Sequence, residues 1–222
     1  EQAGALLPSQ TNALFTHLAR GPWPTKPLGE AAEIRSGVTL GRRLAGKTVR
    51  LPYLRVANVQ DGRLDLSRMK EVEILESETE KWKLRAGDML LTEGGDWDKL
   101  GRGAVWNDEI PDCIHQNHIF CVRTSAEQFV PEFLAQFIGS PVGKAYFQGA
   151  SKQTTNLASI NQRQLKAFPV VVPPLHEQRR AVGELDALQA EVDALKRLQA
   201  ESAAELDALF SSILDRAFKG EL

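Results

Sequence analysis

Four side chains that could bind a metal lie close together, between residues 113 and 121. They are Cys113, His115, His118 and Cys121. Structural zinc sites usually take two pairs of ligands from separated turns, so ligands this close in sequence are poorly placed around one tetrahedral ion. We therefore expect two buried cysteines with hydrogen-bonding histidines, and no metal site. The acids Glu93, Asp96 and Asp98 could hold a hard cation, but we expect this Gly-Gly loop to be solvated.

Motifs for catalysis are missing from the sequence. No lysine follows Asp or Glu by two positions, the spacing with which many metal-dependent nucleases direct a metal and a lysine at one phosphate. The only Pro-Pro pair, Pro173-Pro174, follows Val172, so the Asn/Asp-Pro-Pro motif of methyltransferases is absent. There is no Walker loop and no G-x-S-x-G motif. The sequence thus offers no motif for any of these reactions.

Three glycine-rich loops carry side chains suited to nucleic acid. They are IRSGVTLGRR (34–43), GGDWDKLGRG (94–103) and SKQTTNLASIN (151–161). Glycine allows close backbone approach, arginine can fork onto a phosphate or a guanine edge, and Gln or Asn can pair with adenine. The candidate DNA-binding residues are Arg35, Arg42, Arg43, Arg55, Lys99, Arg102, Lys152, Gln153, Thr154, Thr155 and Asn156.

The charge distribution is uneven although the net charge is only −2. Residues 35–70 hold nine Lys or Arg and two acids, whereas residues 173–222 hold six bases and ten acids. A basic segment is therefore expected to bind DNA, although an ordinary solvated surface would also fit. No apolar run is long enough to span a membrane, and two cysteines are too few for a disulfide framework. A cytoplasmic protein with no membrane partner is expected.

The C-terminal segment predicts one long helix. No proline interrupts it between Pro174 and Lys219, and Gly220 is a stop signal. Apolar residues recur with a heptad spacing over five repeats, broken by Gln199 and Ser202. A stripe this long needs a partner helix, from this chain or another, although a helix packed along its own domain was an open alternative. The predicted helix-pairing residues are Leu185, Leu188, Val192, Leu195, Leu206, Leu209 and Ile213.

The rest of the chain predicts an α+β domain. We therefore expect a mixed α/β globular domain over residues 1–172, with an N-terminal extension at 1–22 of uncertain role, and a spacer helix over 173–222. Asn161 with Gln164 resembles a capping box at the start of a short helix. The expected helices are 9–19, 131–138, 140–149 and 162–166, and the expected strands are 51–59, 72–75, 88–92, 103–106, 114–122 and the AFPVVVP segment.

The order of these segments resembles a known family. TTNLASINQRQLKAFPVVVPPLHEQRRAV (154–182) is similar to the junction in specificity subunits of type I restriction–modification enzymes, where a target recognition domain meets a conserved long helix. LGEAAEIRSGVTLGRR (28–43), YLRVANVQDGRLDL (53–66), LRAGDMLLTEGGDWDKLGRGAVW (84–106) and HQNHIFCVR (115–123) look like successive elements of that domain. The closing ILDRAFKGEL resembles the end of the conserved region, so the resemblance covers residues 23–222.

This resemblance implies a function. The globular domain would read one half of a split double-stranded DNA site, and the helix would pair antiparallel with a second helix as a spacer. Methyltransferase subunits would bring S-adenosylmethionine, and restriction subunits would use ATP and Mg²⁺. The specificity subunit itself would catalyse nothing and bind no cofactor, which agrees with the missing motifs. A typical subunit has two recognition domains and two helical regions, whereas this chain has one of each. It is thus a natural half-subunit, which would self-associate through its helix and read a palindromic site, or half of something longer.

Two other interpretations stay open on sequence grounds. The chain could be the recognition module of a single-chain restriction–methylation enzyme, whose methyltransferase motifs would lie upstream. It could also be a coiled-coil adaptor that does not bind DNA.

Overall fold

The globular domain is built around a four-stranded antiparallel sheet with the strand order β2-β9-β5-β7. The computed structural model describes residues 2–95, 97, 100–153 and 158–220. At one edge of the sheet, Ala32 of β2 lies opposite Thr124 of β9. At the other edge, Met89 of β5 lies opposite Val105 of β7. Its strands are β2 (Ala32–Ser36), β9 (Ile119–Thr124), β5 (Met89–Thr92) and β7 (Gly103–Val105).

Both faces of this sheet are buried, because side chains alternate across a strand. Met89 and Leu91 of β5 belong to the large core beneath the helices. Leu90, between them, belongs to a second core with Trp106 and Cys121. The apolar run that predicted this strand thus reflects burial on two sides.

A second sheet has the order β4-β3-β8 and corrects two strand predictions. The segment 51–59 does not continue as a strand, because Asn58 closes a single helical turn by accepting from the Arg55 N–H and donating to the Asp65 carbonyl. The segment 114–122 divides into β8 and β9, because the chain turns at residues 116–118. The elements are β3 (Thr48–Leu54), η1 (Val56–Asn58), β4 (Lys70–Leu75) and β8 (Ile114–His115).

Two smaller sheets join distant segments. β1 (Thr25–Pro27) pairs with β12 (Pro169–Val171), so the first and the last strand of the domain lie side by side. β11 (Ala158–Ser159) lies between β10 (Lys152–Gln153) and β6 (Gly94–Gly95). The remaining short helices are α2 (Leu28–Ala31), η2 (Glu76–Glu78) and α3 (Thr79–Trp82).

Three short helices are confirmed, and each contributes to the core that contains Met89 and Leu91 of the main sheet. They are α4 (Pro131–Gly139), α5 (Pro141–Ala150) and α6 (Gln162–Lys166). The capping box of α6 is confirmed, since the Asn161 and Gln164 side chains each accept from the other residue's backbone N–H. Between the helices, aromatic rings of Phe133, Phe137 and Phe168 pack with centroids 5 to 7 Å apart.

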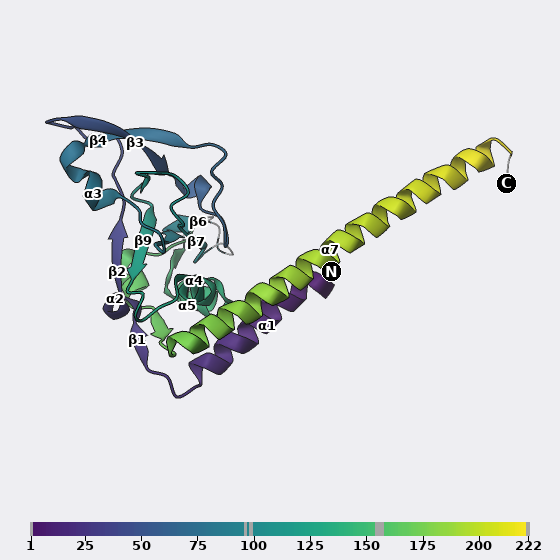
Figure 1. Cartoon of the computed structure of the whole chain (residues 1–222), viewed down its shortest axis with the longest axis horizontal. Helices are drawn as coiled ribbons and strands as arrows, with labels where there is room; N and C mark the ends of the chain where they lie inside the picture. Colours follow the sequence, from purple (N-terminus) through teal and green to yellow (C-terminus); the bar gives the residue numbers. More distant parts are fainter. Residues whose placement is uncertain (1, 96, 98–99, 154–157, 221–222) are drawn as a thin grey trace.

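Two helices run side by side and antiparallel at the edge of the domain (Figure 1). The long one, α7 (Leu175–Phe218), confirms the predicted C-terminal helix and has 44 residues, about 66 Å at 1.5 Å per residue. The other is α1 (Gln2–Ala19), which begins seven residues before the predicted start at residue 9. Pro8, which precedes the predicted helix, lies inside the observed one. The Thr11 hydroxyl donates to the Leu7 carbonyl at 2.8 Å, and Phe15 and Leu18 are buried in the core. Packing against α7 and the domain thus outweighs the helix-breaking effect of proline.

Candidate nucleic-acid interface

The second and third glycine-rich loops are joined by a strand pair. Ala158 lies opposite Gly95, and Ser159 lies opposite Gly94. A Cβ atom on Gly94 would lie 2.9 Å from the Ala158 carbonyl oxygen, so this close approach requires glycine. The Ile160 N–H also donates to the Glu93 carbonyl at 2.9 Å. Two loops that are about 60 residues apart in sequence therefore form one surface.

The turn Gln116–Asn117–His118 connects the second loop to the first. The Asn117 N–H donates to the Val38 carbonyl at 3.0 Å, and the Val38 N–H donates to the His115 carbonyl at 2.8 Å. On the other side, the Glu93 N–H donates to the His118 carbonyl at 3.0 Å, and the Glu93 carboxylate contacts His118 Nδ1 at 2.6 Å. We call the surface made by the described residues 37–46, 93–95, 97, 100–102, 116–118, 151–153 and 158–160 the recognition face.

Glycine also sets the contact between the first loop and this turn. A Cβ atom on Gly37 would lie 2.0 Å from the His115 carbonyl oxygen, so any other residue would push the loop away. The turn itself is held by two more backbone bonds, from Gln116 to the Leu54 carbonyl and from Ile119 to the Gln116 carbonyl, each 3.0 Å. The middle of the recognition face is thus fixed by main-chain hydrogen bonds, while the side chains of Gln116 and Asn117 remain available.

Gln116 and Asn117 are candidate base-reading residues that the sequence prediction missed. Both are half-buried, and within the described part of the chain neither side-chain amide makes a hydrogen bond. Glutamine and asparagine amides can pair with both hydrogen-bonding groups of an adenine edge. The signal was present as the polar run HQNH inside an otherwise apolar segment, which favours a turn over a continuous strand.

The predicted cations of the first loop differ in how they are held. Arg43 is exposed and is the more available of the pair. Arg42 forms a bidentate ion pair with Glu78, which raises the pKa of the guanidinium. Arg35 lies in strand β2, and its side chain is 19% exposed; it donates to the Lys81 carbonyl at 2.8 Å and contacts Glu33. Arg42 and Arg35 must each release a partner before they can grip a phosphate.

The other predicted DNA-binding residues that the structure describes lie in three settings. Arg55 donates to the Arg68 carbonyl at 2.6 Å, so its guanidinium is held by a residue outside the three loops. Arg102 is half-buried beside the second loop, and its Nε is buried with no hydrogen-bond partner in the described structure. The backbones of Lys152 and Gln153 form β10. Lys99, Thr154, Thr155 and Asn156 fall outside the described residues.

The cysteines and His115 are core residues. Burial raises the pKa of the Cys113 and Cys121 thiols to about 12, so both stay protonated and are poor metal ligands at neutral pH. Burial also lowers the pKa of His115 to about 4, and its Nδ1 lies 3.0 Å from the Ile119 carbonyl oxygen. Among the described residues, no group of three or more His, Cys, Asp or Glu side chains is arranged to hold a metal ion.

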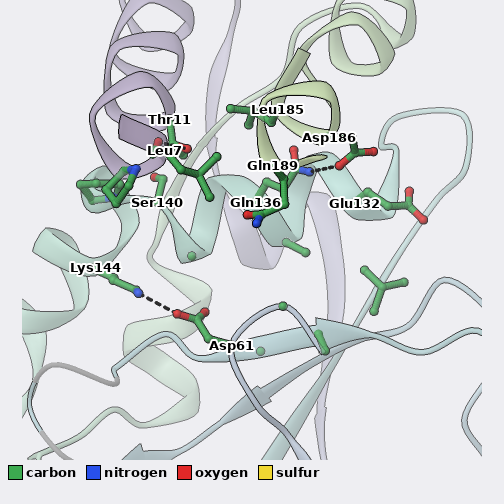
Figure 2. A pocket seen from close by; sticks show the side chains of 18 of the residues that line it. Leu7, Thr11, Asp61, Glu132, Gln136, Ser140, Lys144, Leu185, Asp186 and Gln189 are labelled. Carbon is green, nitrogen blue, oxygen red and sulfur yellow. Dashed lines mark hydrogen bonds and ion pairs between the residues drawn. The ribbon is translucent and has the colours of Figure 1, made fainter. Parts of the chain in front are cut away.

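A groove of about 780 Å³ lies between the α1–α7 pair and the domain (Figure 2). Its walls come from α1, α4, α5, α7 and β7. Lys144 and Asp61 form an ion pair at 2.9 Å on one side, and Gln136 donates to Asp186 at 3.1 Å on the other. The charged groups of this groove are thus paired with one another or spread along its walls. This arrangement suits contact with another molecule rather than nucleophilic catalysis.

The predicted helix-pairing residues divide into two groups along α7. Leu185 and Val192 are buried and Leu188 is half-buried, so this part of the stripe is covered within the chain. Leu195 is 45% exposed, and Leu206, Leu209 and Ile213 are exposed as well. The open alternative of a helix packed along its own domain therefore holds for the first half of α7. Among the described helices, none is long and apolar enough to cross a membrane.

The chain thus combines an α+β domain, whose polar loops converge at one surface, with a long projecting helix. The profile of the type I restriction modification DNA specificity domain matches residues 21–202. The chain belongs to this family.

Curated relatives agree with this assignment. The chain is 28% identical over 192 residues to the EcoKI type I restriction enzyme specificity subunit of Escherichia coli K12, covering 86% of this chain and 41% of that protein. It is 25% identical over 223 aligned positions to the StySPI specificity subunit of Salmonella potsdam, covering 99% of this chain and 48% of that protein. The chain thus spans about half the length, or less, of the curated relatives it matches.

Solved structures share the fold. The HsdS subunit from Thermoanaerobacter tengcongensis superposes with a TM-score of 0.57 at 24% identity, covering 98% of this chain and 53% of that one. A chain from a structural study of complex assembly in the type I R-M system gives a TM-score of 0.66 at 24% identity, covering 100% of this chain and 54% of that one. The resemblance that the sequence suggested is confirmed at the level of family and fold.

Proposed function

We propose that this chain is the sequence-specific DNA recognition component of a type I restriction–modification system and reads one half of a bipartite site. The convergence of the three glycine-rich loops on the Gln116–His118 turn carries the proposal. Main-chain bonds hold this surface in shape, and it presents amide groups for base edges beside exposed Arg43 for the phosphate backbone. The family match covers the globular domain from residue 21 as well as α7 up to residue 202, which favours this role over a coiled-coil adaptor without DNA binding.

The long helix gives this reader a fixed geometry. The buried Gln178 side chain donates to the carbonyls of Gln128 and Pro173, each at 2.8 Å, and accepts from the Val130 N–H at 2.9 Å. The direction of α7 is thus set by hydrogen bonds to the domain. In this proposal, the helix spaces two recognition domains and offers methyltransferase and restriction subunits a surface.

The catalytic steps belong to the partner subunits in this proposal. Methyltransferase subunits supply S-adenosylmethionine, and restriction subunits supply ATP and Mg²⁺, while this chain binds none of these and catalyses nothing. The exposed second half of α7 supports self-association of the chain. Two identical readers related by a two-fold axis would read a palindromic, interrupted DNA site.

Methylome sequencing tests the recognition role. A host that carries this chain and its cognate methyltransferase subunit is compared with a host that lacks only this chain. We expect an interrupted, modified motif that disappears with the deletion. No lost motif, with both proteins expressed and associated, would overturn the proposal.

A paired variant tests the recognition face itself. Replacing Gln116 and Asn117 by alanine should relax one or more positions of the motif while the chain still binds its methyltransferase subunit. The matched control replaces Gln10 and Asn12, an exposed glutamine and asparagine on α1, and should leave the motif unchanged. An unchanged motif in the Gln116/Asn117 variant would remove the turn from the reading surface.

A further inference from the structure

Glu93 and His118 form a cross-strand pair on the recognition face, where β5 ends and β9 begins. The register of these strands places Thr92 opposite Ile119, so the next pair along is Glu93 with His118. The Glu93 N–H donates to the His118 carbonyl at 3.0 Å, and a carboxylate oxygen of Glu93 lies 2.6 Å from His118 Nδ1. The two residues are therefore joined through both their backbones and their side chains.

The backbone of Glu93 is held on two sides. Its N–H is bonded to His118, and its carbonyl accepts from the Ile160 N–H at 2.9 Å, just after strand β11. The Glu93 side chain is 35% exposed, whereas the His118 side chain is 61% exposed. A half-buried carboxylate on a fixed backbone thus orients an exposed imidazole.

The carboxylate determines which ring nitrogen of a neutral His118 carries the proton. An ionised carboxylate only accepts hydrogen bonds, so Nδ1 must be the donor. Nε2, at the far end of the ring, then keeps its lone pair and is an acceptor. Within the part of the chain that the structure describes, the imidazole makes its polar contact through Nδ1 alone. The acceptor at Nε2 is therefore available to a ligand.

An acceptor in this place can pair with few groups on duplex DNA. Phosphate oxygens are acceptors themselves, and the negative charge of Glu93 would be repelled by them. The donors in the major groove are exocyclic amines, N6 of adenine and N4 of cytosine. Guanine O6 and thymine O4 occupy the corresponding places and are acceptors. His118 Nε2 can thus distinguish adenine from guanine, or cytosine from thymine.

We propose that His118 is a specificity-determining residue, which accepts a hydrogen bond from the exocyclic amine of an adenine or a cytosine, and that Glu93 is its positioning residue. The inference rests on the DNA recognition proposed above and names the chemical group that this part of the recognition face reads. The neighbouring amides of Gln116 and Asn117 each carry donors and an acceptor, whereas His118 presents one acceptor alone. His118 therefore excludes a base that carries a keto oxygen in place of the amine.

Motif sequencing of three variants tests the pair. His118→Ala, expressed with the cognate methyltransferase subunit, should give a motif in which one position of the half-site accepts both A and G, or both C and T. Glu93→Ala should relax the same position, because the imidazole loses its orientation. Glu93→Gln should keep the original motif, since the glutamine carbonyl can accept from Nδ1–H in place of the carboxylate.

The matched control is a second exposed histidine beside a glutamate. His176 Nε2 lies 3.6 Å from a carboxylate oxygen of Glu177, at the start of α7 and outside the recognition face. His176→Ala and Glu177→Ala should leave the motif unchanged. Association with the methyltransferase subunit, measured for every variant by size-exclusion chromatography, shows that a changed motif does not come from a chain that fails to fold.

A base analogue measures the single hydrogen bond. At the position that relaxes, the duplex carries a base without the exocyclic amine, purine for adenine or 2-pyrimidinone for cytosine. In complex with the methyltransferase subunit, the unsubstituted chain should bind this duplex about 2- to 10-fold more weakly than the natural one, relative to the same ratio for His118→Ala. The comparison of ratios removes the effect of the analogue on the duplex itself.

An unchanged motif in His118→Ala, or equal ratios with the analogue, would overturn the inference while DNA recognition stands. Relaxation in Glu93→Gln as well as in Glu93→Ala would also overturn it, because the charge of the carboxylate would then matter and His118 would act as a cation. The proposed recognition role fails by a different result, the absence of any lost motif when the whole chain is deleted. The two failures are therefore distinguishable.

Discussion

The Gln178 side chain accepts a hydrogen bond from the Val130 N–H at 2.9 Å and thereby fixes the base of the long helix to the globular domain. Its amide nitrogen satisfies two further backbone carbonyls, so every hydrogen-bonding group of this fully buried side chain is used. The loop before α4 and the loop before α7 are therefore held together by one residue. A recognition domain that rocked on its helix could not keep a fixed distance between two half-sites.

Replacing Gln178 by alanine should destabilise this junction. The variant leaves the Val130 N–H and two carbonyls without their partner, and each unsatisfied buried group costs about 1–3 kcal/mol. We expect the free energy of unfolding, measured with urea, to fall by at least about 2 kcal/mol. The matched control, Gln10→Ala at an exposed position of α1, should change it by less than about 0.5 kcal/mol. Equal stability of the two variants would contradict the anchoring role.

The ion pair between Asp88 and Arg123 should be a second sensitive point. Asp88 is buried, accepts from two nitrogens of Arg123 at 2.5 and 2.6 Å, and also accepts from the Arg85 N–H. Arg123→Met leaves a buried carboxylate without its cation, which costs about 3–5 kcal/mol. The control is Arg50→Met, because Arg50 forms an exposed pair with Glu71, and such pairs contribute about 0–1 kcal/mol. Thermal and urea unfolding of both variants measure the difference.

The sequence predicted those parts of the fold that local patterns determine. Heptad spacing and the absence of proline predicted α7, and Asn161 with Gln164 predicted the capping box of α6. Local patterns failed where a distant contact decides. The helix predicted from residue 9 begins at Gln2, where packing on α7 maintains it in spite of Pro8, and the strand predicted over 114–122 is interrupted by the Gln116 turn, which a hydrogen bond from the Gln116 N–H to the Leu54 carbonyl holds in place.

The candidate site was predicted as three separate loops. Composition indicated which loops could contact DNA, but their convergence depends on the pairing of β11 with β6, between segments about 60 residues apart. Nor could composition show which cations are engaged elsewhere. Arg42 and Arg43 are equivalent in sequence, yet only Arg42 reaches Glu78. The identity of a side chain is local information, whereas its availability depends on its neighbours in space.

Stability should depend on pH through His115. Burial lowers its pKa from 6.5 to about 4 in the folded protein. Between these two values the unfolded chain binds a proton that the folded chain does not, so this contribution is fully present above about pH 6.5 and is lost as the pH falls toward 4. Since one pKa unit corresponds to about 1.4 kcal/mol, the loss is on the order of 3 kcal/mol.

Urea unfolding at pH 7 and pH 4.5 checks this dependence. His115→Gln should lose less stability between the two pH values than the unsubstituted chain, whatever its stability at pH 7. His176→Gln, which changes an exposed histidine on α7, should keep the original dependence. If His115→Gln shows the same loss as the unsubstituted chain, the buried neutral histidine is not its source.

Removing the carboxylate of Glu78 should strengthen DNA binding, because it frees Arg42. Their hydrogen bond lowers the pKa of Glu78 and raises that of Arg42, so the pair is intact at neutral pH and keeps one cation of the first loop occupied. In Glu78→Gln, Arg42 can join Arg43 on the phosphate backbone, and one added phosphate contact steepens the plot of log affinity against log salt by about 0.9. Glu184→Gln, which removes one of the two carboxylate partners of Arg180 on α7, changes the net charge equally and should leave that slope unchanged. Titrations of duplex DNA at several salt concentrations, with the methyltransferase partner present, measure the slopes. Equal slopes for the two variants would place Arg42 outside the DNA interface.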